Sequence, residues 1–225
     1  MKALLYKEFK LALHPICYLF VLIFPFMILI PSYPIAIGFI YILTTYPILF
    51  LGANKGQQSN DLLYSTLLPV RKKDIVLARI FTVLIIQLVS FALMSCLYPV
   101  ALIINNSISG GNTPGIGLDG YVSILAIALI GFALADLIFF PIYYKNGKSI
   151  VMSTLFMIIG FIIYLAIFTI ALPYIPVVGE GYIKILSKSG LGIQFIFLGI
   201  AIAISGLIHF LIYKVCSKEL ERVDF

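Results

Sequence analysis

The sequence predicts an all-α membrane protein with six transmembrane helices, from its composition, its long apolar runs and the distribution of its cations. Hydrophobic residues make up 62% of the 225 residues, charged residues make up 11%, and the mean hydropathy is +1.14. In a soluble domain about half of the residues are apolar and about a quarter are charged. The net charge of +6 therefore indicates the cytoplasmic loops of a membrane protein, and we expect no nucleic-acid partner.

The first part of the chain, residues 1–14, is an amphipathic stretch that predicts an interfacial helix. Its apolar residues, including Leu5 and Phe9, recur at helical spacing. Its three lysines form a cationic side that suits anionic lipid headgroups. The stretch can serve as a simple membrane anchor, or it can also contact a cytoplasmic partner.

Six apolar runs follow, each a candidate for the roughly 20 apolar residues that a transmembrane helix needs. The first two are short and are joined by Pro-Ser-Tyr-Pro, which predicts a tilted or strained hairpin. Between the last two, residues 173–189 contain two prolines and two glycines and predict a broken extracellular loop. The six predicted spans are residues 15–30, 35–53, 75–104, 121–144, 150–172 and 190–213.

The cations orient these spans. Thirteen of the 15 lysines and arginines fall on one side of the membrane if the spans alternate in direction, and only Lys184 and Lys188 fall on the other. Cytoplasmic loops carry such an excess of cations, so both termini are predicted to be cytoplasmic. The abundance of isoleucine and lysine, with no tryptophan, indicates an AT-rich bacterial genome and hence a bacterial cell membrane.

The most polar block of the chain lies between the second and third runs and predicts a short cytoplasmic helix at residues 59–69. Ser59 or Asn60 can cap this helix, and Asp61 suits the positive end of its dipole. Pro69 ends it, because the residue before a proline avoids helical geometry. A helix this short is unstable alone in water. The block is therefore either a docking element or a solvated connector.

Asp136 is the acidic residue that lies well inside a predicted span. A charge at the bilayer centre costs about 2.5–3.5 kcal/mol on insertion scales, so we expect its carboxyl to have a polar partner, such as Arg79 or another basic group. Gln87 and His209 are single polar residues on apolar faces, where we expect hydrogen-bonded packing roles. A proton relay through Asp136 is the alternative to a packing role.

Two pairs of small residues have the spacing that lets helices approach closely, either within one subunit or between two. These pairs are Gly131 with Ala135 and Gly199 with Ala203.

No complete motif for catalysis, metal binding or ATP binding occurs in the sequence. The Gly-Lys-Ser at 147–149 lacks the glycine of a phosphate-binding loop, because Ile142 stands at that position. The cysteines have neither zinc-ligand spacing nor a disulfide framework. We expect no cofactor bound by this chain. Uphill transport would take its energy from another polypeptide or from an ion gradient.

Two passages carry a resemblance to a known family. "NDLLYSTLLPVRKKDIVLAR" resembles the stretch of small ABC-2-type permeases in which an acid and "LPV" with basic residues lead into the third span. "FPIYYKNGKSIV" resembles the turn between their fourth and fifth spans. The similarity covers essentially the whole chain. It is closest to the subfamily with the permeases of bacterial antimicrobial-peptide and phenol-soluble modulin exporters, whose fold is type V exporter-like.

The resemblance implies an assembly. Two permeases would pair in the membrane, each with a separate ATPase subunit that binds ATP and Mg²⁺. Residues 59–69 would be the coupling helix in a groove of the ATPase, residues 1–14 the connecting helix, and 173–189 would cap the exit. The expected cargo is hydrophobic or amphipathic, with peptide ahead of lipid or drug. The residues assigned to ATPase coupling are Asp61, Leu62, Leu63, Tyr64, Leu67, Leu68, Pro69, Arg71 and Lys72.

Other functions are consistent with the same residues. The chain could be a membrane-embedded immunity or sensor protein without transport activity. It could be an ion-coupled transporter, for which Asp136 is the candidate relay. An intramembrane enzyme would need catalytic groups that the sequence does not supply. Binding of an ATPase subunit would separate the exporter from these alternatives.

Overall fold

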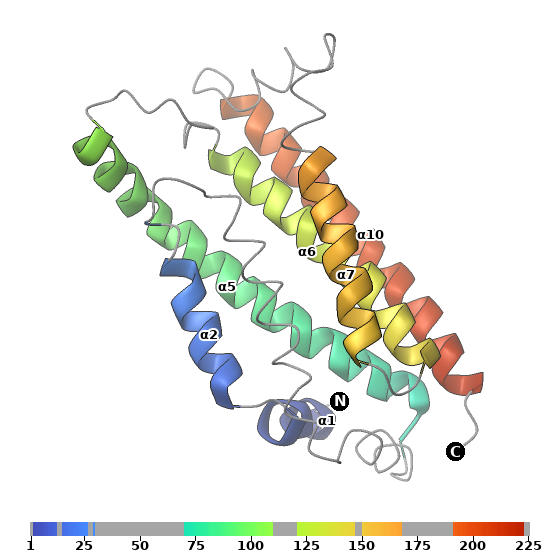
Figure 1. Cartoon of the computed structure of the whole chain (residues 1–225). Helices are drawn as coiled ribbons and strands as arrows, with labels where there is room; N and C mark the ends of the chain where they lie inside the picture. The colour runs from blue at the N-terminus through green and yellow to red at the C-terminus, as the bar shows by residue number, and fades with distance from the viewer. Residues whose placement is uncertain are drawn as a thin grey trace.

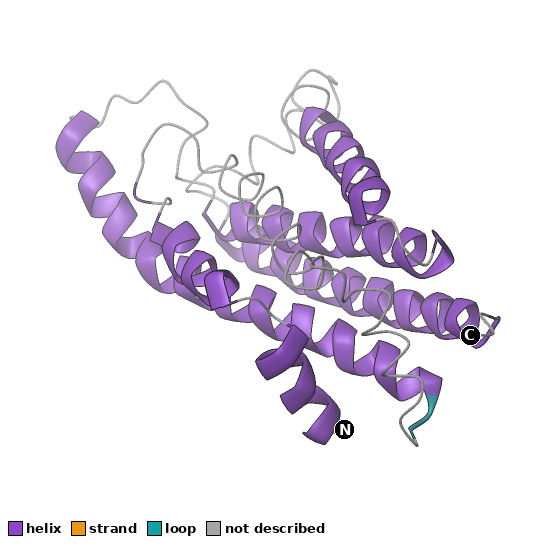
Figure 2. Ribbon diagram, turned by 60° about the horizontal axis from the view of Figure 1, so that its bottom comes forward, coloured by secondary structure: helices purple, strands orange, loops and turns teal. Residues whose placement is uncertain are grey.

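The structure, a computed structural model of the chain, describes residues 2–12, 15–26, 29, 70–109, 121–146, 150–167 and 191–222. These residues are almost entirely helical and contain no strand, so the described part has the all-α fold that the sequence predicts (Figure 2). Three predicted elements lie outside the described residues. They are the span at 35–53, the coupling helix at 59–69 and the broken loop at 173–189.

The N-terminal elements are short. Helix α1 (Lys2–Lys7) continues directly into a π-helix, η1 (Glu8–Ala12), so the interfacial stretch changes its winding after one to two turns. Helix α2 (Pro15–Phe26) begins with a proline, as suits the first helical position, and also contains Pro25. The predicted helix at 1–14 is thus two helical pieces, separated from α2 by residues 13 and 14.

Four longer helices follow, namely α5 (Lys72–Ser109), α6 (Tyr121–Asn146), α7 (Ile150–Ala166) and α10 (Leu191–Arg222). At 1.5 Å per residue, the 38 residues of α5 extend for about 57 Å, well beyond a hydrocarbon core of about 30 Å. In the described part of the chain, three stretches are long and apolar enough to cross a membrane, and α7 contains a shorter apolar stretch, Val151–Tyr164. The three are Lys72–Leu97, Leu125–Lys145 and Gly192–Arg222.

Helix α6 is central to the packing. It packs most extensively against α10 and then against α7, whereas α5 packs mainly against α10 and α2 and only lightly against α6. The long helices alternate in direction (Figure 1). As a result α1, the start of α5, the end of α6 and the end of α10 lie at one end of the bundle, and the described lysines and arginines gather there. An exposed ion pair between Lys73 and Glu221 joins α5 to α10 at this end.

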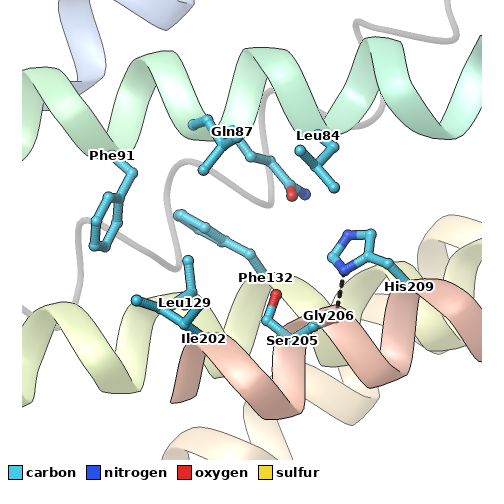
Figure 3. A pocket seen from close by; sticks show the side chains of 10 residues that line it. Leu84, Gln87, Phe91, Leu129, Phe132, Ile202, Ser205, Gly206 and His209 are labelled. Carbon is cyan, nitrogen blue, oxygen red and sulfur yellow. Dashed lines mark hydrogen bonds between the residues drawn. The ribbon is translucent and has the colours of Figure 1, made fainter. Parts of the chain in front are cut away.

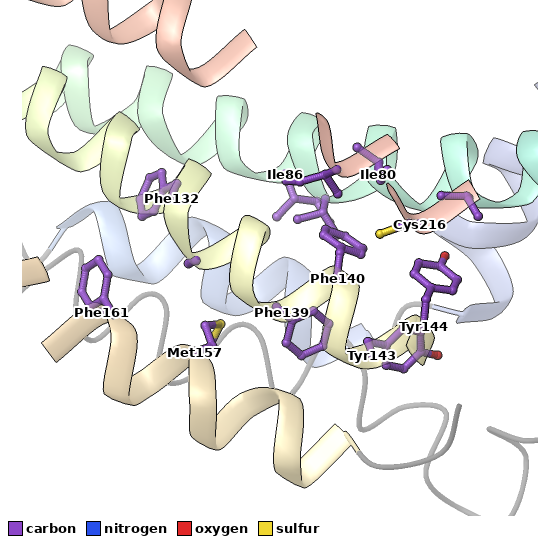
Figure 4. Close-up of a cluster of buried hydrophobic side chains, with 14 of the residues drawn as sticks. Ile80, Ile86, Phe132, Phe139, Phe140, Tyr143, Tyr144, Met157, Phe161 and Cys216 are labelled. Carbon is purple, nitrogen blue, oxygen red and sulfur yellow. The ribbon is translucent and has the colours of Figure 1, made fainter. Parts of the chain in front are cut away.

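The core contains a ladder of aromatic side chains along α6 (Figure 4). Phe139 stacks on Tyr143 at 5.7 Å between ring centroids, and Phe140 stacks on Tyr144 at 6.4 Å, because each pair is separated by one helical turn. All four rings are buried. By contrast, α7 and α10 expose rows of large apolar side chains such as Ile159 and Ile196, as expected of surfaces in contact with lipid.

The two pairs of small residues differ in their surroundings. A Cβ added to Gly131 would lie 2.9 Å from a ring carbon of Phe161 and 3.2 Å from one of Tyr164, so the approach of α6 to α7 needs a glycine there. A Cβ added to Gly199 would meet no atom within 4 Å. The first pair therefore packs within the subunit, and the second lies on an open face of α10.

Candidate functional site

Three polar side chains from three helices meet inside the bundle. Asp136 on α6 is fully buried, and its Oδ2 accepts a hydrogen bond of 2.9 Å from Nε2 of Gln87 on α5. Nε2 of His209 on α10 lies 3.1 Å from the same oxygen. Asp136 lies about 14 Å along α6 from Lys145, at 1.5 Å per residue, so the three groups are at membrane depth. We call Asp136, Gln87 and His209 the central cluster.

The protons of the central cluster follow from its geometry. Nδ1 of His209 lies 2.7 Å from the carbonyl oxygen of Ser205, which can only accept, so Nδ1 carries a hydrogen. One proton then lies between Nε2 of His209 and Oδ2 of Asp136. It belongs either to an imidazolium paired with a carboxylate or to a carboxylic acid bonded to a neutral imidazole. The pair has no net charge in either form, which removes the cost of an isolated charge in the membrane.

Only one of the two carboxyl oxygens of Asp136 is hydrogen-bonded within the described residues. Its Oδ1 is buried and has no hydrogen-bond partner among the described residues. The two partners of Asp136 therefore share a single oxygen. Within the described residues, no three His, Cys, Asp or Glu side chains come close enough together to hold a metal ion.

A pocket of about 310 Å³ opens beside the central cluster, between α5, α6 and α10 (Figure 3). Gln87 and His209 belong both to the cluster and to the wall of the pocket, and Ser205 adds a hydroxyl. Leu88 and Ile202, which also line the pocket, are exposed, so the pocket is open at the surface of the described bundle. The remaining lining residues are Leu84, Phe91, Leu129, Phe132 and Gly206.

A second buried polar group lies at the cationic end of the bundle. Glu8 on η1 accepts hydrogen bonds from Nε of Arg79 at 3.1 Å and from its Nη2 at 3.4 Å. Nη1 of Arg79 donates to the hydroxyl of Tyr143 on α6 at 3.0 Å, and the guanidinium also lies 5.9 Å from the centre of that ring. Glu8 and Arg79 are 5% and 6% exposed. We call Glu8, Arg79 and Tyr143 the clasp.

The clasp decides between two expected partners of Asp136, which were Arg79 or another basic group. The basic partner is His209. Arg79 pairs with Glu8 instead, because it lies about 12 Å nearer the start of α5 than Gln87 does. Sequence reasoning missed Glu8 altogether. The signal was present, since Glu8 is the only acid in the first 14 residues and Arg79 is a cation within an apolar run.

The residues predicted to contact an ATPase fall into two groups. Asp61, Leu62, Leu63, Tyr64, Leu67, Leu68 and Pro69 lie outside the described residues, so their helix and its docking stay predictions. Arg71 is exposed just before α5, and Lys72 is the first residue of α5. In the connecting segment, Leu5 is half-buried and Phe9 packs against the buried core.

Comparison with known proteins gives one match. The family described as "ABC-2 family transporter protein" matches residues 3–217, which is nearly the whole chain. No curated protein and no solved structure is matched.

Proposed function

The chain belongs to the ABC-2 family of transporter proteins and is a permease component of an ABC transporter, and we propose that it exports hydrophobic or amphipathic cargo, with peptide as the first candidate. The pocket is the observation that supports this class of cargo. Apolar and aromatic side chains form most of its walls, and Gln87, Ser205 and His209 supply polar groups on one side. Pockets of this kind bind ligands that are mostly apolar and are oriented by a few polar contacts.

The assembly that we propose needs further chains. A second copy or a paralogue would complete the passage through the membrane, and a separate ATPase subunit would bind ATP and Mg²⁺. The cationic end of the bundle faces the cytoplasm of a bacterium, because cytoplasmic segments concentrate lysine and arginine. Both termini then lie on the side of the ATPase. The coupling helix at residues 59–69 would contact the ATPase beside the N-terminal segment.

Co-purification tests the ATPase partner. The full chain is expressed with the ATPase subunits of its own genome, and the bound subunit is identified after solubilisation. Leu67→Asp with Leu68→Asp is expected to abolish binding while membrane insertion stays intact. Ser65→Asp, on the polar side of the predicted helix, is the matched control and should bind as the wild type does. Retention by the double variant would overturn the coupling assignment. A chain that binds no ATPase would favour the immunity or sensor function.

Two glycines of α10 provide a matched test of the cargo site. Gly206 lines the pocket and Gly199 does not, and a Cβ added to either meets no atom within 4 Å. Gly206→Leu therefore places a side chain at the pocket without forcing a clash at its own Cβ, and Gly199→Leu adds the same group elsewhere. In vesicles with the ATPase, amphipathic peptide should stimulate ATP hydrolysis by the wild type and by Gly199→Leu. Gly206→Leu should lose this stimulation. Equal stimulation of both variants would exclude the pocket as the cargo site.

A further inference from the structure

The clasp joins three segments that are distant in the sequence. Glu8 belongs to the N-terminal segment, by which we mean α1 and η1 together, while Arg79 and Tyr143 belong to α5 and α6. The hydroxyl of Tyr18 on α2 also bonds to the carbonyl oxygen of Phe9, next to Glu8. The N-terminal segment is therefore attached to the bundle through directional bonds as well as apolar contact. Its π-helical turn begins at Glu8, the residue that makes the ion pair.

Stability alone is a weak explanation for a buried ion pair. Removing two charges from water is costly, and well-packed apolar residues of similar volume are often equally stabilising or better. The ion pair instead fixes how the segments that it joins are oriented. The planar guanidinium of Arg79 contacts Glu8 through two nitrogens and Tyr143 through a third. This fork fixes the rotation of the N-terminal segment against α5, which an apolar contact would leave free to slide.

The clasp and the central cluster lie on the same two helices. Arg79 and Gln87 are about two turns apart on α5, and Tyr143 and Asp136 are about two turns apart on α6. Because α5 packs only lightly against α6, these polar bonds are prominent links between the two helices in the described part of the chain. Between Asp136 and Tyr143 on α6 lies Phe139, whose ring stacks on that of Tyr143. A shift of α5 against α6 at the clasp would therefore also alter the wall of the pocket.

We propose that the clasp is the contact through which the N-terminal segment sets the position of α5 against α6, and thereby the shape of the pocket. Glu8 and Arg79 are positioning residues in this role, since neither lines the pocket. The inference rests on the proposed function in one respect, namely that ATP hydrolysis in a partner moves the N-terminal segment. Motion of that segment would reach the pocket through Arg79 and Tyr143.

The test uses the full chain reconstituted with its ATPase. The triple variant Glu8→Met, Arg79→Met and Tyr143→Phe removes every polar group of the clasp, so neither charge of the buried Glu8–Arg79 pair remains without the other. Lys7, which lies 3.8 Å from Glu8, loses that contact but keeps 12% of its side chain exposed. The triple variant is expected to keep the wild-type unfolding temperature and ATPase binding. Transport per ATP hydrolysed should fall by about fivefold or more, the lower limit of typical couplings between distant sites. Arg79→Lys, which keeps the charge and loses the fork, should give an intermediate value.

The matched control is the exposed ion pair between the same end of α5 and α10. Lys73→Gln with Glu221→Gln removes an ion pair of similar length, 3.2 Å, without touching the N-terminal segment. This variant should transport as the wild type does. A triple variant that also couples ATP hydrolysis to transport like the wild type would overturn the proposal. A triple variant that has lost ATPase binding or folding would overturn the claim that the clasp acts by positioning alone.

A distance measurement separates this proposal from the proposed function. Spin labels at Tyr6→Cys on α1 and Lys145→Cys on α6, both exposed positions, report how firmly the N-terminal segment is held, without any need for ATP or transport. The natural cysteines are replaced in this background. The wild type should give a narrow distance distribution and the triple variant a broad one. A wild-type assembly that does not transport would contradict the proposed function. An unchanged distance distribution in the triple variant would contradict the positioning role of the clasp, whether or not the assembly transports.

Discussion

The clasp and the central cluster both tie α5 to α6, but they hold their buried carboxyl groups in different ways. In the clasp, Glu8 faces a full positive charge and uses both of its oxygens, one for Nε of Arg79 and one for Nη2. In the central cluster, Asp136 uses one oxygen for both Gln87 and His209. The first arrangement pairs a carboxyl with a permanently charged guanidinium, and the second shares a proton between an acid and a base.

This difference determines how each group responds when one of its side chains is substituted. An arginine does not lose its proton in a protein, so Arg79 stays charged when Glu8 is removed, and Glu8 stays buried when Arg79 is removed. Asp136 and His209 can instead redistribute a proton when a neighbour changes. We therefore expect the clasp to be more sensitive than the central cluster to the loss of one partner.

The largest effect should come from Arg79→Leu, which removes both hydrogen bonds of the Glu8 carboxyl and leaves Lys7, whose Nζ lies 3.8 Å from Oε1, as its partner in an ion pair. Breaking a buried ion pair in this way costs about 3–5 kcal/mol. Adding Glu8→Leu should restore most of the lost stability, because no buried charge then remains without a partner. The free energy of unfolding in detergent, measured for both single variants and the double variant, checks this. Additive losses in the double variant would show that the two side chains do not act as a pair.

A smaller loss is expected for His209→Leu. The Leu side chain suits the apolar pocket, but Asp136 keeps only Gln87 as a partner among the described residues. Leaving a buried polar group short of a partner costs about 1–3 kcal/mol. The loss should be below that of Arg79→Leu, because Asp136 keeps its hydrogen bond from Gln87 whereas Glu8 loses both of its bonds from Arg79. Adding Asp136→Asn removes the acid and should recover part of the stability. A loss as large as that of Arg79→Leu would contradict the proposed proton sharing.

The sequence predicts the central cluster better than it predicts the clasp. The need of Asp136 for a partner follows from the cost of a charge in the membrane, and the structure supplies Gln87 and His209. The identity of the partners does not follow, because helical periodicity relates only residues three or four positions apart. Glu8 and Arg79 are 71 positions apart, and their pairing depends on how each helix is rotated about its axis. The sequence places both on plausible helices without indicating that they meet.

The pairs of small residues also show that a pattern within one helix does not identify its neighbour on another helix. Gly131 with Ala135 and Gly199 with Ala203 have identical spacing, and this spacing alone predicts close packing for both pairs. Gly131 lies against the rings of Phe161 and Tyr164, whereas the Cβ position of Gly199 is open. The neighbour that makes a glycine necessary comes from another helix, so the pattern within one helix cannot decide between the two outcomes. The long apolar helices are predictable because their signal is contained within each run.

The smallest effect should come from the exposed ion pair of Lys73 and Glu221. Its length, 3.2 Å, is close to the 3.1 Å of the contact between Arg79 and Glu8, but its side chains are about half exposed. Exposed pairs contribute about 0–1 kcal/mol, and salt screens them. Lys73→Gln should therefore change the free energy of unfolding by less than either buried variant, and raising the ionic strength should remove the difference. The effect of Arg79→Leu should persist at high salt, because its charges are shielded from ions. If both variants lost stability equally and with the same salt dependence, burial would not be what distinguishes the clasp from a surface ion pair.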